Sequence, residues 1–225
     1  MEELTLRPVA HIRSDFSSKF GIPRQSGIVE SLSAEIVFEE EFRNADMLRG
    51  LEDFSHLWLL WHFSANRSQD WSPTVRPPRL GGNVRMGVFA TRSPFRPNPV
   101  GLSCVRLLEI LPTAHEGHIL RVGGADLMDG TPIFDIKPYV PYADAHPEAL
   151  GGFTSVKSRH VEVCIAPELL ARFPAEKRGA VLGILAEDPR PSYQNDPERI
   201  YGFGFAGREI RFSVRDDVLT VLDVC

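Results

Sequence analysis

The densest group of residues that could do chemistry is an arginine-rich stretch in the first half of the chain. Between Arg67 and Arg106 there are seven arginines, one acid and no lysine, so this stretch carries a formal charge of +6. The whole chain carries −5, so the remainder is strongly acidic. A basic segment in an acidic protein indicates a local anion site, whereas arginines scattered over a solvated surface would give the same count.

Part of this stretch, residues 85–102, is typical of a strand that runs into a rigid loop. The loop contains three prolines and an asparagine together with Arg92 and Arg96. Proline rings restrict the backbone, so the two guanidinium groups should be held in fixed places. Fixed guanidinium groups suit a carboxylate or a phosphate ligand. The alternative is a rigid structural corner with no ligand.

A second candidate is the acidic turn Asp126-Leu-Met-Asp129-Gly-Thr-Pro132. Two carboxylates three residues apart across a turn can point into one pocket, where they could accept a proton or stabilise a cation. An ordinary turn, with Asp129 bonded to a backbone amide two residues on, is the alternative. A third short motif is Lys19-Phe-Gly-Ile-Pro-Arg-Gln25, near the N-terminus.

Other chemical motifs are weak. Gly202-Phe-Gly-Phe-Ala-Gly207 matches the dinucleotide fingerprint, but the residues after it alternate like a strand, so we interpret it as a β turn. The seven histidines lack the spacings of metal ligands, and we expect no metal. No GxSxG motif or P-loop is present.

The elements that must position these residues are mostly β. The chain has 225 residues, enough for one or two domains with a real core. Gly and Pro number 18 each, which favours turn-rich β structure.

The composition also indicates where the protein is located. Three widely spaced cysteines suit a reduced compartment. The longest apolar runs are far shorter than the ~20 residues of a membrane helix, and the acidic N-terminus does not resemble a signal peptide, so we expect a cytoplasmic protein without a membrane segment.

The pattern predicts many short strands in the first two thirds, as in a closed or strongly curled barrel. Residues 27–29 are predicted as a short strand, residues 54–63 as a strand buried on both faces, and residues 84–90 as a half-buried strand. Two helices, at 167–173 and 175–187, and a small terminal sheet are expected later. The predicted fold is mainly β (α+β overall), with a single-sheet β-barrel domain at 1–147 and a smaller α+β domain at 155–225.

Taken together, the motifs resemble the TrmO family, also called TsaA-like or YaeB-like proteins. The matching stretches are Gly21-Ile-Pro-Arg-Gln25, Phe54-Ser-His-Leu-Trp58, residues 76–83, residues 85–103, residues 126–139 and Asp188-Pro-Arg-Pro191. The resemblance is nearly continuous over the first 145 residues and thinner afterwards. It implies an S-adenosylmethionine-dependent tRNA methyltransferase that acts on N6 of threonylcarbamoyladenosine beside the anticodon, built as a β-barrel and working as a homodimer.

The resemblance also implies a cofactor site close to the subunit interface. Its residues would be Pro23, Arg24, Gln25, Phe63, Ser64, Ala65, Arg92, Leu102, Asp129, Gly130, Thr131 and Pro132. Ser64 and Ala65 replace the His and polar residue usual in the family, so a side-chain contact there would be altered. Arg24 or Arg92 would hold the methionine carboxylate, and backbone groups of Leu102 and the Asp129 turn would read adenine and ribose.

Asp126 and Asp129 are the catalytic candidates, because removal of the N6 proton should assist methyl transfer. The arginines expected to hold phosphates of the anticodon loop are Arg76, Arg79, Arg85, Arg96 and Arg190. Phe95 or Tyr139 would stack on a base. Two alternatives remain open: an RNA-binding barrel without catalysis, and a methyltransferase of the same fold that acts on a small molecule.

Overall fold

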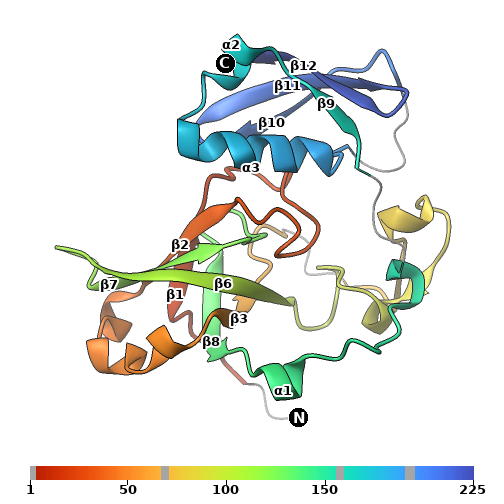
Figure 1. Cartoon of the computed structure of the whole chain (residues 1–225). Coiled ribbons are helices and arrows are strands. Elements are labelled where there is room, and N and C mark those ends of the chain that lie inside the picture. Colours follow the sequence, from red (N-terminus) through yellow and green to blue (C-terminus); the bar gives the residue numbers. More distant parts are fainter. Residues whose placement is uncertain (1–3, 67–70, 156–159, 191–195) are drawn as a thin grey trace.

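Six strands from the first two thirds of the chain form a closed antiparallel barrel in the computed structural model (Figure 1). The structure describes residues 4–66, 71–155, 160–190 and 196–225, so Arg67 lies outside the described residues. The barrel order is β1-β2-β7-β6-β3-β8. The strands are β1 (Ala10–Arg13), β2 (Ser33–Phe38), β3 (His56–His62), β6 (Val100–Pro112), β7 (His118–Gly123) and β8 (Pro132–Pro138). The prediction of a mainly β protein with a barrel is confirmed.

The barrel core is built from residues that alternate along each strand. Ile12, Ile36, Leu120 and Ile133 are fully buried and meet inside the barrel. In β3, Leu57 and Leu59 are fully buried, whereas Trp58 between them and Leu60 and Trp61 after them are partly exposed. The prediction that this strand is buried on both faces is therefore wrong, because a barrel strand turns only one face to the core.

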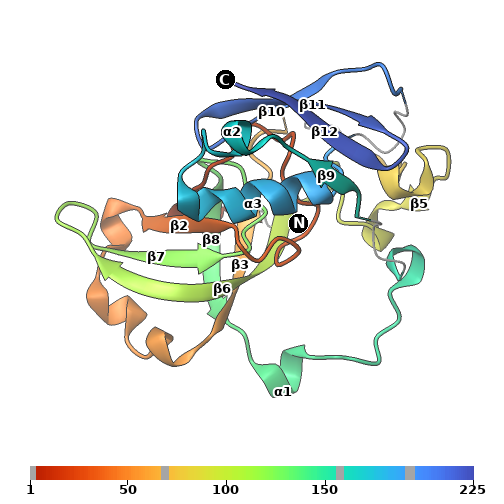
Figure 2. The ribbon, with the colours of Figure 1, turned by 45° about the horizontal axis from the view of Figure 1, so that its top comes forward.

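Residues 71–99 form an arm outside the barrel (Figure 2). The arm contains the two-stranded pair β4 (Thr74–Val75) and β5 (Met86–Gly87), with 3-10 turns at Pro78–Leu80 and Val88–Ala90. The predicted half-buried strand at 84–90 is wrong: only Val88 is buried there, because this stretch has no long sheet neighbour. The predicted strand at 27–29 is likewise a turn.

A second unit follows the short helix α1 (Pro141–Asp144) and a long connector. Its sheet has the order β10-β11-β12-β9, with β9 (Glu162–Cys164) parallel to β12. The remaining elements are α2 (Pro167–Leu170), α3 (Ala175–Ala186), β10 (Tyr201–Phe205), β11 (Arg208–Arg215) and β12 (Val218–Val224). The glycine-rich motif at residues 202–207 contains the turn of the β10–β11 hairpin, where Gly207 has φ +72°. The interpretation of this motif as a β turn is confirmed.

The core of this second unit extends beyond its own sequence. Phe205, Phe212 and Ile184 share one buried cluster with Phe16 and Leu32, which come from the loop between β1 and β2. Figure 1 shows α3 between the C-terminal sheet and this loop. The two parts of the chain are therefore joined by shared packing, and the predicted boundaries 1–147 and 155–225 stay a prediction.

Candidate cofactor site

One end of the barrel collects most of the predicted cofactor residues. β3 is paired with the start of β6 on one side, where Leu60 faces Leu102 and Trp61 faces Gly101. It is paired with the start of β8 on the other side, where Trp61 faces Ile133. The residues just after β3, which are Phe63, Ser64 and Ala65, therefore leave the barrel beside Leu102 and beside the Thr131-Pro132 end of the acidic turn.

Trp61 forms an aromatic wall at this end. Its ring lies against the backbone of Gly101, where a Cβ atom would stand 2.3 Å from the ring. The Phe63 ring meets the Trp61 ring edge-on, with centroids 4.3 Å apart. Leu102 lies next to Gly101 and leaves 47% of its surface exposed. Apolar and aromatic surface of this kind suits the flat base of a nucleoside.

The N-terminal motif and the proline-braced loop meet at the same place. The Arg92 guanidinium donates a hydrogen bond to the Gln25 side-chain oxygen. The Gln25 amide in turn donates to the backbone carbonyl of Arg24. Pro23 is buried, whereas Arg24 and Arg92 are exposed and retain donors for an anion. The structure thus brings together two motifs that are far apart in the sequence.

Asp126 lies at the centre of a polar network below this surface. The Ser103 hydroxyl donates to Asp126 Oδ1 over 2.6 Å, and Trp61 Nε1 donates to Ser103 Oγ over 3.0 Å. Burial raises the pKa of the Asp126 carboxyl, while bonds from Ser103 and Ser26 and the charge of Arg92 offset part of that rise. A carboxyl with a raised pKa is a better proton acceptor near neutral pH.

Asp129 has different partners. Its Oδ1 accepts a hydrogen bond from the Ser14 backbone amide over 3.0 Å. The turn is tight: Gly130 has φ +74°, and the Thr131 hydroxyl donates to the Met128 carbonyl over 2.6 Å. The bonds described for the two carboxylates therefore form two separate networks. Asp129 holds the end of β1, and the bond to Ser14 replaces the turn bond that we considered from the sequence.

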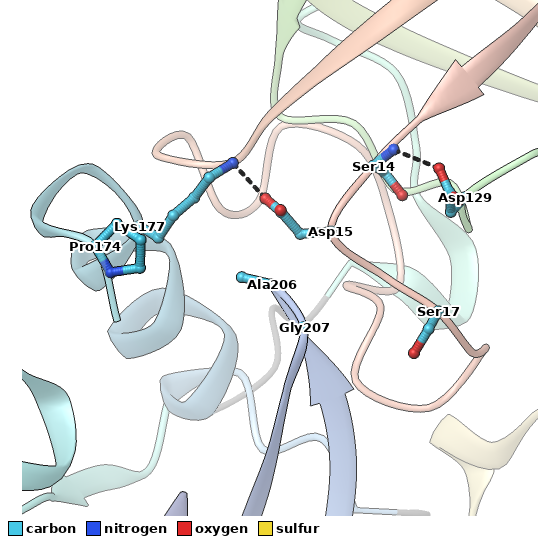
Figure 3. Close-up of a pocket in the computed structure, with 8 residues that line it drawn as sticks. All are labelled: Ser14, Asp15, Ser17, Asp129, Pro174, Lys177, Ala206 and Gly207. Atoms are coloured by element: carbon cyan, nitrogen blue, oxygen red, sulfur yellow. Dashed lines mark hydrogen bonds and ion pairs between the residues drawn. The ribbon is translucent and has the colours of Figure 1, made fainter. Parts of the chain in front are cut away.

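Asp129 also lines a cavity of about 330 Å³ between the barrel and the second unit (Figure 3). On its far side, Lys177 Nζ pairs with Asp15 over 2.5 Å. Lys177 lies on α3, and the hairpin residues Ala206 and Gly207 form another wall. Figure 3 shows Asp15 and Lys177 pointing toward each other, while Asp129 is directed to Ser14.

The arm carries the predicted RNA-binding arginines. Arg76, Arg79 and Arg85 are exposed, and residues 71–99 contain no acidic residue. The Arg85 guanidinium donates to Thr74 Oγ1 over 2.9 Å, which links the two short strands of the arm. The Arg96 guanidinium donates to the Thr91 carbonyl over 3.0 Å and is half-buried, so it also braces the proline-rich loop.

Arg190 is in a different environment. Its guanidinium binds both carboxylate oxygens of Asp188 at 2.8 Å, and only 11% of its side chain is exposed. The bonds to Asp188 raise the pKa of Arg190. This geometry gives Arg190 a structural role in the turn after α3, and its expected contact with RNA stays a prediction.

Sequence reasoning missed Ser26, Trp61 and Ser103 as members of the site. Ser26 Oγ accepts from the Cys104 backbone amide over 3.1 Å, and Ser103 is one of the few buried polar side chains. Only Ser103 offered a signal in the sequence, a hydroxyl at an inward position of a long barrel strand. Among the described residues, no cluster of His, Cys, Asp and Glu could hold a metal ion, and no helix is long and apolar enough to span a membrane.

A closed barrel with a polar and aromatic surface at one end, joined to a small α+β unit, matches the β-barrel methyltransferase architecture that the motifs predict. Two models of known protein families match the chain and identify its family. The tRNA-methyltransferase O N-terminal domain matches residues 11–145, and the TrmO C-terminal domain matches residues 160–225. The chain belongs to the tRNA-methyltransferase O (TrmO) family.

Similar proteins cover most or all of the chain. The tRNA (adenine(37)-N6)-methyltransferase of Escherichia coli K12 is 42% identical, over 96% of this chain and 95% of that protein. The protein of the same name from Eikenella corrodens is 48% identical over 72% of this chain and 91% of its own length. The crystal structure of TrmO from Pseudomonas aeruginosa superposes with a TM-score of 0.82 at 32% identity, covering 100% of this chain and 99% of that one.

Proposed function

We propose that this protein is an S-adenosylmethionine-dependent tRNA methyltransferase that methylates N6 of threonylcarbamoyladenosine next to the anticodon. The observation that carries the proposal is the meeting of Gln25, Arg92 and Asp126 at the aromatic end of the barrel. The names of the similar full-length proteins support the tRNA adenine as the methylated base. The acceptor with its threonylcarbamoyl group comes from the motif resemblance.

The residues at this end fit the cofactor. S-adenosylmethionine supplies an electrophilic methyl group on a sulfonium centre. The exposed guanidinium groups of Arg24 and Arg92 match the carboxylate of its methionine part. Trp61, Phe63 and exposed Leu102 offer a surface for its adenine. Backbone groups of Leu102 and of the turn at Asp129 would read the edge of the adenine and the ribose.

The protein then has two tasks. The first is to hold the acceptor nitrogen in line with the methyl group, because orientation provides much of the rate of such a displacement. The second is to take up the N6 proton. Asp126 suits the second task, since its pKa is raised by burial and its orientation is fixed by the Ser103 hydroxyl. Ser103 is itself held by Trp61 Nε1, so the three side chains form one directional chain of bonds.

The arm is the part that we assign to the tRNA. Arg76, Arg79 and Arg85 would contact anticodon-loop phosphates without reading sequence. Phe95 leaves 45% of its surface exposed in the same arm and is free to stack on a base, whereas Tyr139 packs against Trp58 with centroids 5.9 Å apart. The arm is therefore the favoured source of the stacking ring. A tRNA substrate supports a cytoplasmic location, which we include in the proposal.

A second copy of the chain would complete the site. Leu102 at the barrel end and Phe89 and Phe95 on the arm are all exposed, with Phe89 at 81%. Large apolar side chains left exposed on a surface are candidates for an interaction with a partner. We therefore include a homodimer in the proposal. Sedimentation of the purified chain tests it, and a monomer at micromolar concentration would exclude it.

The decisive experiment uses labelled S-adenosylmethionine with tRNA that carries or lacks the threonylcarbamoyl group, followed by mass spectrometry of the nucleosides. We expect label on N6 of the modified adenosine and none on the unmodified tRNA. tRNA binding without any transfer would show an RNA-binding barrel instead. Transfer to a small molecule that excess tRNA does not inhibit would show the other alternative.

A further inference from the structure

The loop that carries residues 23–25 is anchored in the core of the C-terminal unit. Before the motif, Phe16 is buried in that core and Phe20 packs against it. After the motif, Val29 and Leu32 are buried in the same cluster. The loop therefore belongs to the barrel by sequence and to the C-terminal unit by packing (Figure 2).

Gly21 makes the closest of these contacts. It has φ +91°, and a Cβ atom at this position would lie 2.3 Å from Cδ2 of Phe203 on β10. The Phe20 ring meets the same Phe203 ring edge-on, with centroids 6.3 Å apart. Phe203 itself is 3% exposed, so its ring has a fixed position. The backbone two residues before Pro23 thus rests directly on one aromatic ring of the C-terminal sheet.

The other flank of the loop is held by α3. A Cβ atom on Gly183 would lie 2.6 Å from a methyl group of Val29, so the helix backbone and this side chain are in close contact. Farther toward β1, the Ala206 amide donates to the Asp15 carbonyl over 3.0 Å, and Lys177 pairs with the Asp15 carboxylate (Figure 3). Both the C-terminal sheet and its helix therefore hold the loop.

Bonds to the barrel lie on both sides of the motif. Before the motif, the Phe16 carbonyl accepts from the Asp129 amide over 2.9 Å. The bonds that follow the motif lie closest to it. Ser26 Oγ accepts from the Cys104 amide over 3.1 Å, and the Gly27 amide donates to the Gly124 carbonyl over 2.9 Å. Gln25 lies between these two sets of anchors and binds Arg92. We infer that the C-terminal unit sets the position of the cofactor loop, with Phe203 as a positioning residue that acts through Gly21. The inference rests on the proposed function, because it assigns cofactor binding to residues 23–25.

The test measures steady-state kinetics of the full chain as Gly21→Ala, Phe203→Leu and the double variant. Gly21→Ala places a methyl group against the ring, so we expect the KM for S-adenosylmethionine to rise about tenfold or more, with the KM for tRNA and kcat at saturating cofactor nearly unchanged. Phe203→Leu keeps the core apolar and should raise the same KM less. In the double variant the smaller side chain makes room, so part of the loss should be recovered.

Gly202→Ala is the matched control. It lies next to Phe203 on β10 but is exposed. The nearest atom to its Cβ would be the tip of the Glu209 side chain, at 3.0 Å, and the next atoms would lie at ordinary contact distances of 3.6 Å and 3.9 Å. We expect it to keep the wild-type KM. An unchanged KM for the cofactor in both Gly21→Ala and Phe203→Leu would overturn the inference. So would a fall in kcat alone, because that reports a smaller folded fraction. A wild-type chain that binds no S-adenosylmethionine would refute the proposed function itself.

Discussion

Asp126 is the side chain whose chemistry depends most on its surroundings. Because burial raises its pKa, the folded protein binds this proton more tightly than the unfolded chain does. Stability should therefore fall as pH rises from the unfolded pKa of about 3.9 through the raised folded value. Asp126→Asn cannot ionise, so this part of the pH dependence should disappear. Thermal unfolding from pH 4 to pH 8 measures it, and identical slopes for both proteins would contradict the expectation.

The same variant separates binding from turnover. If Asp126 takes up the N6 proton, Asp126→Asn should bind S-adenosylmethionine normally and lose about 10²–10⁴ in kcat. Ser103→Ala leaves the carboxylate in place but removes the 2.6 Å bond that orients it, so its loss should be smaller. Full turnover in Asp126→Asn would remove the carboxylate from the mechanism.

Arg92 is expected to bind the cofactor carboxylate. Arg92→Ala removes a charge-assisted bond and should weaken S-adenosylmethionine binding by about 1.5–3 kcal/mol. Calorimetry measures this directly. Arg85→Ala is a suitable control, because its guanidinium bonds Thr74 on the arm and should not affect the cofactor. Equal affinity of the Arg92→Ala protein and the wild type would reassign the residue.

Asp129 offers a test between a cofactor contact and a structural bond. Asn at this position would keep an oxygen for the Ser14 amide. If the bond to Ser14 is its whole role, Asp129→Asn should behave as the wild type. We expect a cofactor contact, which predicts weaker S-adenosylmethionine binding and a smaller effect on turnover at saturating cofactor. Wild-type affinity by calorimetry would support the purely structural role.

Among the elements, the arm is the one with a predicted electrostatic function. Arg76→Ala and Arg79→Ala should each weaken binding of different tRNAs to a similar extent and flatten the dependence of affinity on salt. The reason is that a phosphate contact releases counterions and does not read bases. A salt titration of tRNA binding measures both effects. Unchanged slopes in both variants would assign the positive charge of the arm to another ligand.

The arm is also where sequence reasoning about elements fails. Residues 84–90 alternate as a strand would, but only Met86–Gly87 pairs, because the alternation is local and the pairing needs a partner strand. The barrel strands were predictable, since their alternation reflects one buried face.

In the candidate cofactor site, the motifs with Arg92 and Asp126 could be found from their residue types. The hydrogen bonds of Ser26 and Ser103 could not be predicted, because they join residues distant in the sequence.

The whole molecule should unfold as one unit, since the second core includes side chains from the loop after β1. All three tryptophans lie in the N-terminal half, so their fluorescence reports on the barrel and the arm. Phe212→Ala, in the fully buried C-terminal core, should cost about 3–5 kcal/mol and lower the fluorescence midpoint together with that of circular dichroism. Leu222→Ala, at an exposed position, is the control. Two separate transitions would contradict a shared core.

The shared core also has a consequence for how the protein is made. Phe16 and Val224 lie in the same buried cluster although they stand near opposite ends of the chain. A ribosome releases the first of these residues long before the second, and contacts between them cannot form until residue 224 has emerged. The barrel strands can pair on the nascent chain, but the loop at residues 23–25 must wait for β12. If residues 23–25 bind the cofactor as we propose, cofactor binding should wait for the C-terminal unit, and a product truncated before β12 should carry the motif without its support.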